Sequence, residues 1–173
     1  MINEHEHWFA ARTRANQELG LRNSLLKLEI KHYLPTQVII RQISGRIKQV
    51  EVPIIKNLIF IKTTMQGAFS LTKEYALKIS YIKDSENGSL LVVPEKQMID
   101  FMFLMDFSKD AIHQCSEQFV KGDRVKIVKG ELSGIEGELI RLEGKSYVLL
   151  RIPQVVAVSV KIPRSYLKKL KSK

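Results

Sequence analysis

The stretch that decides the fold of the C-terminal part is Gly122-Asp123-Arg124-Val125-Lys126-Ile127-Val128-Lys129-Gly130-Glu131-Leu132-Ser133-Gly134-Ile135-Glu136-Gly137. The turn pair Gly122-Asp123 precedes a strand in which Val125 and Ile127 alternate with charged residues. Glycines then fall at Gly130, Gly134 and Gly137. They mark a tight loop that returns into a strand, because glycine adopts backbone angles that other residues resist. The stretch predicts a small, strongly bent β structure.

This pattern resembles the KOW motif, which is found in ribosomal proteins and transcription elongation factors. The glycine spacing GxxxGxxG alone is weak evidence, and the preceding GDxVxI makes it stronger. The resemblance implies a small β-barrel of the SH3-like type over residues 119–173, working beside nucleic acid.

The charge of the chain is concentrated in the same region. The chain has 173 residues, 45% of them hydrophobic, and a formal net charge of +10. Residues 1–107 carry 14 Lys and Arg against 11 Asp and Glu, which gives +3, whereas residues 119–173 carry 13 against 5, which gives +8. An excess of this kind favours a polyanionic or acidic partner.

The location of the protein is predicted from what the sequence lacks. Cys115 is the single cysteine, so an intrachain disulfide is excluded and a reducing compartment fits. Residues 1–7 have no basic and apolar regions of a signal peptide, and no apolar run reaches the length of a membrane span. We expect a soluble, cytoplasmic protein without a membrane partner, and a monomer.

Hydrophobic periodicity predicts an N-terminal mixture of helices and strands and a C-terminal run of strands. Residues 108–118 are polar and without periodicity, which is typical of a linker. The expected helices are 16–32, 66–78 and Pro94 to 106, and the expected strands are 8–11, 38–43, 47–52, 54–61, 81–82, 90–93, 125–128, 138–142, 147–152 and 155–162. A hairpin turn is expected at Ser44-Gly45-Arg46.

This order of elements is similar to that of the NusG family, including the RfaH and UpxY antiterminators, over residues 8–170. The short hairpin and the lack of an insertion domain place the chain nearer to the UpxY-like branch. The resemblance implies an α+β protein: an N-terminal antiparallel sheet flanked by helices, plus a C-terminal SH3-like KOW β-barrel. The implied domains are 1–107 for polymerase binding, 108–118 as linker and 119–173 for the KOW barrel.

The resemblance also implies a site that binds the clamp coiled coil of RNA polymerase. Family members usually carry an aromatic-Pro-Gly/Asn-Tyr segment, and Ile55, Lys56, Asn57 and Leu58 stand at these positions. Asn57 matches the pattern, whereas the proline and the tyrosine are replaced. The expected polymerase-binding residues are Trp8, Ile54, Ile55, Asn57, Leu58 and Phe60. For Leu58 and Phe60, a role as ordinary core residues is an equal alternative.

In the RfaH-like branch the start of the first helix faces non-template DNA. The matching positions here are Arg14, Gln17 and Lys27, with Arg12 adjacent. A cation near exposed phosphates gains affinity by counterion release, and arginine can stack on an unpaired base. The alternative is a helix face that displays its cations to water. Arg14 is the best single candidate, because it precedes the helix.

The family's barrel recruits a second partner, which is a ribosomal protein or the termination factor Rho. By position, the partner loops here contain Leu132 and Ile135, next to Gly130, Gly134 and Gly137, and the turn with Pro153 and Gln154. An apolar loop tip such as Leu132 is costly to expose unless a partner covers it. The alternative is that Leu132 folds back onto the barrel. The +8 charge suggests either an acidic protein partner or direct RNA contact.

Enzymatic function has little support in the sequence. The four histidines lack metal-ligand spacing, and there is no P-loop, no GxSxG and no plausible Cys-His pair for Cys115. We therefore expect no catalytic activity, no cofactor and no metal. The chief alternative function is a KOW-containing ribosomal or RNA-binding structural protein. Recovery with RNA polymerase or with ribosomal particles would distinguish the two.

Overall fold

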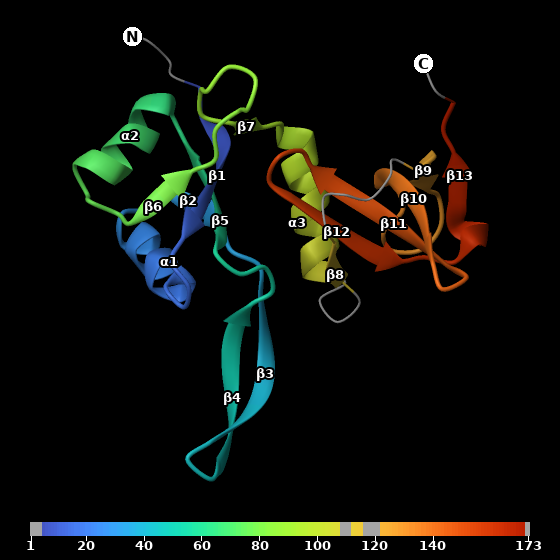
Figure 1. Ribbon diagram of the computed structural model, residues 1–173, viewed down its shortest axis with the longest axis horizontal. Coiled ribbons are helices and arrows are strands. Elements are labelled where there is room, and N and C mark those ends of the chain that lie inside the picture. The colour runs from blue at the N-terminus through green and yellow to red at the C-terminus, as the bar shows by residue number, and fades with distance from the viewer. Residues whose placement is uncertain (1–4, 108–111, 116–121, 172–173) are drawn as a thin grey trace. The chain divides into compact units, whose positions relative to one another are not determined.

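The computed structural model of the chain describes residues 5–107, 112–115 and 122–171. The chain divides into two compact units, residues 1–95 and 96–173 (Figure 1). We call them the N-terminal unit and the C-terminal unit and treat each by itself.

An antiparallel sheet of five strands forms the centre of the N-terminal unit. Its order is β2-β5-β1-β6, and β7 also pairs with β1. The strands are β1 (His7–Thr13), β2 (Lys31–Tyr33), β5 (Leu58–Thr63), β6 (Ile79–Tyr81) and β7 (Val92–Val93). Helices α1 (Glu18–Lys27) and α2 (Met65–Lys73) pack against this sheet. The predicted antiparallel sheet with flanking helices is confirmed.

The two faces of this sheet are both buried at its centre. On one face, Ile59 and Ile61 of β5 pack with Leu21 and Leu25 of α1 and Leu71 of α2. Because side chains alternate along a strand, Leu58 and Phe60 point to the other face, and their exposure is 1% and 0%. Strand β5 is therefore a central strand that is apolar and buried on both of its faces.

Helix α1 is shorter than the predicted helix 16–32. Its end is a Schellman motif: the Ile30 N–H donates to the Leu25 carbonyl and the Glu29 N–H donates to the Leu26 carbonyl, at 3.0 and 3.1 Å. Glu29 adopts the left-handed conformation, with φ 55°. Glycine usually occupies this position, so the sequence contained no ordinary stop signal. Lys31 and His32, predicted to be helical, belong to β2 (Lys31–Tyr33) instead.

Strands β3 (Thr36–Ile43) and β4 (Arg46–Pro53) form a separate two-stranded sheet, the β3–β4 ribbon. Ser44 and Gly45 connect them, and both have positive φ, at 50° and 77°. Two successive positive φ values give the turn that matches the natural twist of a hairpin. The predicted hairpin is confirmed, and the ribbon extends away from the five-stranded sheet (Figure 1).

The C-terminal unit is built on a six-stranded antiparallel sheet of order β13-β9-β10-β11-β12-β8. Its strands are β8 (Ile112–Cys115), β9 (Arg124–Ile127), β10 (Glu136–Leu142), β11 (Lys145–Ile152), β12 (Val156–Lys161) and β13 (Leu167–Lys169). Helix α3 (Glu95–Phe107) precedes the sheet. Within the described residues, no pairing joins β13 to β8, so the predicted closed barrel is not confirmed.

Two strands of this sheet were not expected from the sequence. Strand β8 lies within residues 108–118, which were predicted to be a linker, and it pairs with β12. The rest of that segment lies outside the described residues. Strand β13 is short and basic, and it pairs with β9. Its sequence, Leu-Lys-Lys, has no apolar alternation that could have indicated a strand.

Strand β12 is more buried than its pattern predicted. Val156, Val158, Val160 and Ile162 were expected to share one face of a strand. The three valines lie opposite apolar residues of β11, and Ile162 follows the end of β12. The residues between them are also buried: Ala157 packs with Ile140 and Leu149, and Ser159 has 0% exposure. Burial on both faces is consistent with the position of β12 between β11 and β8, inside the sheet and not at its edge.

No helix in the described part of the chain is both long and apolar enough to span a membrane.

Burial of Tyr81 makes the stability of the N-terminal unit depend on pH. Burial raises the pKa of the Tyr81 hydroxyl from 10.0 to about 12. Between these values the unfolded chain releases a proton that the folded chain keeps, so stability should fall as the pH rises from 10 to 12. Tyr81→Phe should show a smaller fall, measured by denaturant unfolding at each pH. Parallel curves for the parent and Tyr81→Phe would contradict this origin of the pH dependence.

Candidate functional site

The entry to β5 is the point at which the predicted polymerase-binding segment meets the first helix. Asn57 adopts the left-handed conformation with φ 59°, which asparagine tolerates better than most residues. Its N–H donates to the Glu18 carboxylate at 2.9 Å, and its carbonyl accepts from the Thr13 N–H at 3.2 Å. These two bonds fasten the turn before β5 to the ends of β1 and α1.

Glu18 is the residue at this site that the sequence reading missed. It is the first residue of α1 and only 3% exposed. A carboxylate in the first turn of a helix is favoured by the helix dipole. Its position in the first turn was a readable signal, but its bond to Asn57, 39 residues away, was not.

The apolar residues predicted to bind the polymerase are mostly buried. Trp8, Ile55, Leu58 and Phe60 have exposures of 1% or less. Ile54 is half-buried, and its N–H donates to the Pro35 carbonyl at 2.9 Å. At the entry to β5, therefore, Ile54 and Asn57 are the predicted residues that reach the surface.

Two lysines flank the indole of Trp8. The Lys31 and Lys62 ammonium groups lie 6.0 and 5.8 Å from the centre of the ring, within the range of cation–π attraction. Lys62 also pairs with Glu95 at 3.1 Å. The hydrogen bond from Lys62 holds the pKa of Glu95 below its usual value, in spite of the opposing effect of burial. Trp8, Lys62 and Glu95 line a cleft of about 570 Å³.

Three of the four residues predicted to face DNA, Arg12, Arg14 and Gln17, lie in the segment that leads into α1. Arg12 is directly opposite Leu58 in the sheet, and Arg14 and Gln17 are exposed just before α1. Gln17 also lines a groove of about 440 Å³ with residues of α1 and of the segment before β6. Lys27 is in the last turn of α1, about 15 Å along the helix from Gln17. The structure therefore brings the first three together and leaves Lys27 apart.

The glycine-punctuated loop of the C-terminal unit turns its apolar residues inward. Gly130 and Gly134 have φ values of 79° and 101°, which supports the glycine argument at both positions. Leu132 and Ile135 are 6% and 3% exposed. Leu132 therefore folds back onto this unit and is not an apolar tip in contact with solvent.

The turn between β11 and β12 presents a different surface. Pro153 and Gln154 are exposed, and the Val155 N–H donates to the Ile152 carbonyl at 3.0 Å. Gln154 has φ 65°, a conformation that glycine or asparagine usually supplies. Among the predicted partner-loop residues, Gly130, Gly134, Pro153 and Gln154 are exposed, and Pro153 and Gln154 are the ones in this turn.

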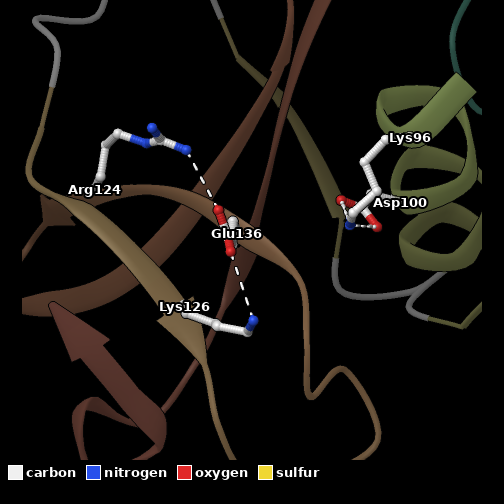
Figure 2. Close-up of polar contacts among 5 residues, drawn as sticks. All are labelled: Lys96, Asp100, Arg124, Lys126 and Glu136. Carbon is white, nitrogen blue, oxygen red and sulfur yellow. Dashed lines mark hydrogen bonds and ion pairs between the residues drawn. The ribbon is translucent and has the colours of Figure 1, made fainter. Parts of the chain in front are cut away.

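Charged side chains on the C-terminal sheet are partly paired. Glu136 accepts from Arg124 at 3.3 Å and lies 3.6 Å from Lys126 (Figure 2). Figure 2 also shows the Lys96–Asp100 pair, which joins two successive turns of α3. Arg151 pairs with Glu138 at 3.1 Å. Residues 119–173 contain 13 cations and five carboxylates, so a net charge of +8 remains after all possible pairing within this segment.

Metal binding has no support in the described part of the chain, where no group of three or more His, Cys, Asp and Glu side chains could hold an ion.

Comparison with known proteins identifies the class and the family. A family model described as "Transcription termination factor nusG" matches residues 6–102, from β1 into α3. This match defines a transcription factor. Because it covers more than half of the sequence, the chain belongs to the NusG family.

Two other comparisons add less. A search of curated proteins found no match. One matching solved structure is described as "Crystal Structure of MjSpt4:Spt5 complex conformation B". It is 18% identical, covers 95% of this chain and 97% of its own, and has a TM-score of 0.28. A TM-score this low does not establish a shared arrangement of the chain.

Proposed function

We propose that this protein is a transcription elongation and antitermination factor that binds the clamp coiled coil of RNA polymerase through domain 1–107. The observation that carries the proposal is the family match over residues 6–102, which coincides with this domain. Asn57 supports it, because its left-handed backbone explains why the family pattern has glycine or asparagine there. No catalytic step is part of the proposal.

The first contact with the polymerase is placed at Ile54 and Asn57, which are partly exposed at the entry to β5. Trp8, Ile55, Leu58 and Phe60 act behind them as the rigid base of the site, because they are buried. A rigid base limits the entropy lost on docking. By favouring the closed clamp, the bound factor would oppose the open, paused state of the polymerase.

In this proposal, residues 119–173 form a KOW domain that recruits a second partner, a ribosomal protein or Rho. The exposed Pro153 and Gln154 are the contact residues that support it. Membership of the UpxY-like branch is part of the same proposal and rests on the two-residue turn of the β3–β4 ribbon.

The function is tested by affinity purification of the full chain from cells that express it. Recovery of RNA polymerase subunits would support the proposal. Recovery of ribosomal particles without polymerase would instead favour the alternative, a ribosomal or RNA-binding structural protein.

The proposed contact with non-template DNA predicts a change in salt dependence. Arg14→Ala with Lys27→Ala should weaken binding to an elongation complex and lower the log–log salt slope by about 0.7 for each lost single-strand phosphate contact. The matched control is Lys73→Ala with Lys83→Ala, which removes the same charge from exposed positions outside α1. An equal salt slope for the Arg14 and Lys27 variant and for the parent would show that these two cations face water and do not contact DNA.

A further inference from the structure

The two faces of the β3–β4 ribbon differ: one is largely apolar, and the other carries three cations together with Ile43, which lies opposite Arg46 and is 42% exposed. Val38, Ile40 and Ile47 share one face and are 65%, 72% and 78% exposed. The other face carries Arg41 and Lys48 directly opposite each other. Arg46, two residues from Lys48, lies on this face as well, and we call these three residues the basic face.

The basic face is not neutralised by the rest of the described structure. Among the described residues, no ion pair involves Arg41, Arg46 or Lys48. The single carboxylate of the ribbon is Glu51, which lies opposite Val38 on the other face. Glu51 is already held by Arg22 at 2.6 Å and by the Thr36 hydroxyl at 2.7 Å.

Two cations directly opposite each other destabilise a pair of strands. The cost is incurred in a sheet of only two strands, whose stability is marginal without further packing. An anionic partner removes the repulsion and gains affinity from counterion release. The arrangement is therefore unfavourable in the free protein and favourable against a polyanion.

The shape of the ribbon selects among polyanions. Each strand has eight residues, about 27 Å, and the ribbon pairs with no further strand among the described residues. The major groove of B-form DNA is about 12 Å wide and admits a two-stranded ribbon. The major groove of duplex RNA is too narrow for side chains to read.

We propose that the basic face of the β3–β4 ribbon binds duplex DNA in the major groove. This surface is separate from the residues before α1 that were considered for single-stranded DNA. It needs no polymerase, so its test and the test of the proposed function can fail independently.

The test measures binding of the full chain to a fluorescent 20-base-pair DNA duplex over a range of salt concentrations. Arg41→Gln, Arg46→Gln and Lys48→Gln together should lower the salt slope by about 0.9 for each lost contact, up to about 2.7. The charge-matched control replaces Lys73, Lys83 and Lys145, three exposed lysines outside the ribbon, with glutamine. This control should keep the parent slope.

Three results would overturn the proposal. The first is an unchanged slope for the basic-face variant, and the second is an equal loss in the charge-matched control. The third is binding of an RNA duplex as tight as that of DNA. A further variant, Ile40→Thr with Ile47→Thr, should leave the slope unchanged. A loss of duplex binding in this variant alone would assign the contact to the apolar face and also overturn the proposal.

Discussion

Phe60→Asp is expected to unfold the N-terminal unit. Phe60 is 0% exposed in the central strand β5, and its neighbours across the sheet are Ala10 and Tyr33, so a new carboxylate finds no cation opposite it. Burial of an unpaired charge and loss of a large aromatic side chain each cost several kcal/mol. Together they approach the whole stability of an ordinary domain, about 5–15 kcal/mol.

The measurement for Phe60→Asp uses Trp8, the single tryptophan of the chain, which is 1% exposed. Its emission should shift to longer wavelength in the variant, as the indole meets water. Phe60→Leu is the control, since it remains apolar and should keep the native emission. Native emission and cooperative unfolding of Phe60→Asp would contradict the placement of Phe60 in the core.

Gly137→Ala is expected to destabilise the C-terminal unit by about 2–3 kcal/mol, as overpacking does in a closely packed interior. A methyl group at Gly137 would lie 2.6 Å from the Leu149 carbonyl oxygen and 2.7 Å from Val148 Cγ1. Both atoms belong to β11, the neighbour of β10, so the two strands would have to move apart. Thermal unfolding of the full chain, followed by circular dichroism, measures the loss.

Gly20→Ala is the control for the Gly137→Ala variant. It lies in α1 with no atom within 4 Å of the added methyl group. Alanine in a helix is favoured over glycine by about 1 kcal/mol, so this variant should unfold no earlier than the parent. Equal stability of Gly137→Ala and the parent would show that β10 and β11 do not approach as closely as described.

The sequence was informative where local patterns determine structure. The turn at Ser44 and Gly45 followed from its residue types. The strand predicted over residues 54–61 is confirmed only in part, because β5 spans Leu58–Thr63 and residues 54–57 form the bend before it. The end of α1 could not be predicted in the same way. Glu29 takes the left-handed position because Ile30, beyond it, packs against the core with Leu25, and that contact depends on the tertiary structure.

The candidate site was predicted in its parts and not in its arrangement. The family pattern indicated Asn57, and position before the helix indicated Arg14. The hydrogen bonds that bring these segments together join Asn57 to Thr13 and to Glu18, which are far from it in the sequence. Burial of Trp8 and of Leu132 depends likewise on packing that periodicity does not describe.

The central claim is that the entry to β5 binds RNA polymerase, and the direct test is the dissociation constant of purified polymerase for the full chain and two variants. Ile54→Asp places a charge at the proposed contact, whereas Phe69→Asp places one on α2, where Phe69 is 48% exposed. Native Trp8 emission confirms that each variant is folded. Binding should be at least tenfold weaker for Ile54→Asp, and Phe69→Asp should keep the affinity of the parent. Equal affinity of folded Ile54→Asp and the parent, or no binding by the parent, would contradict it.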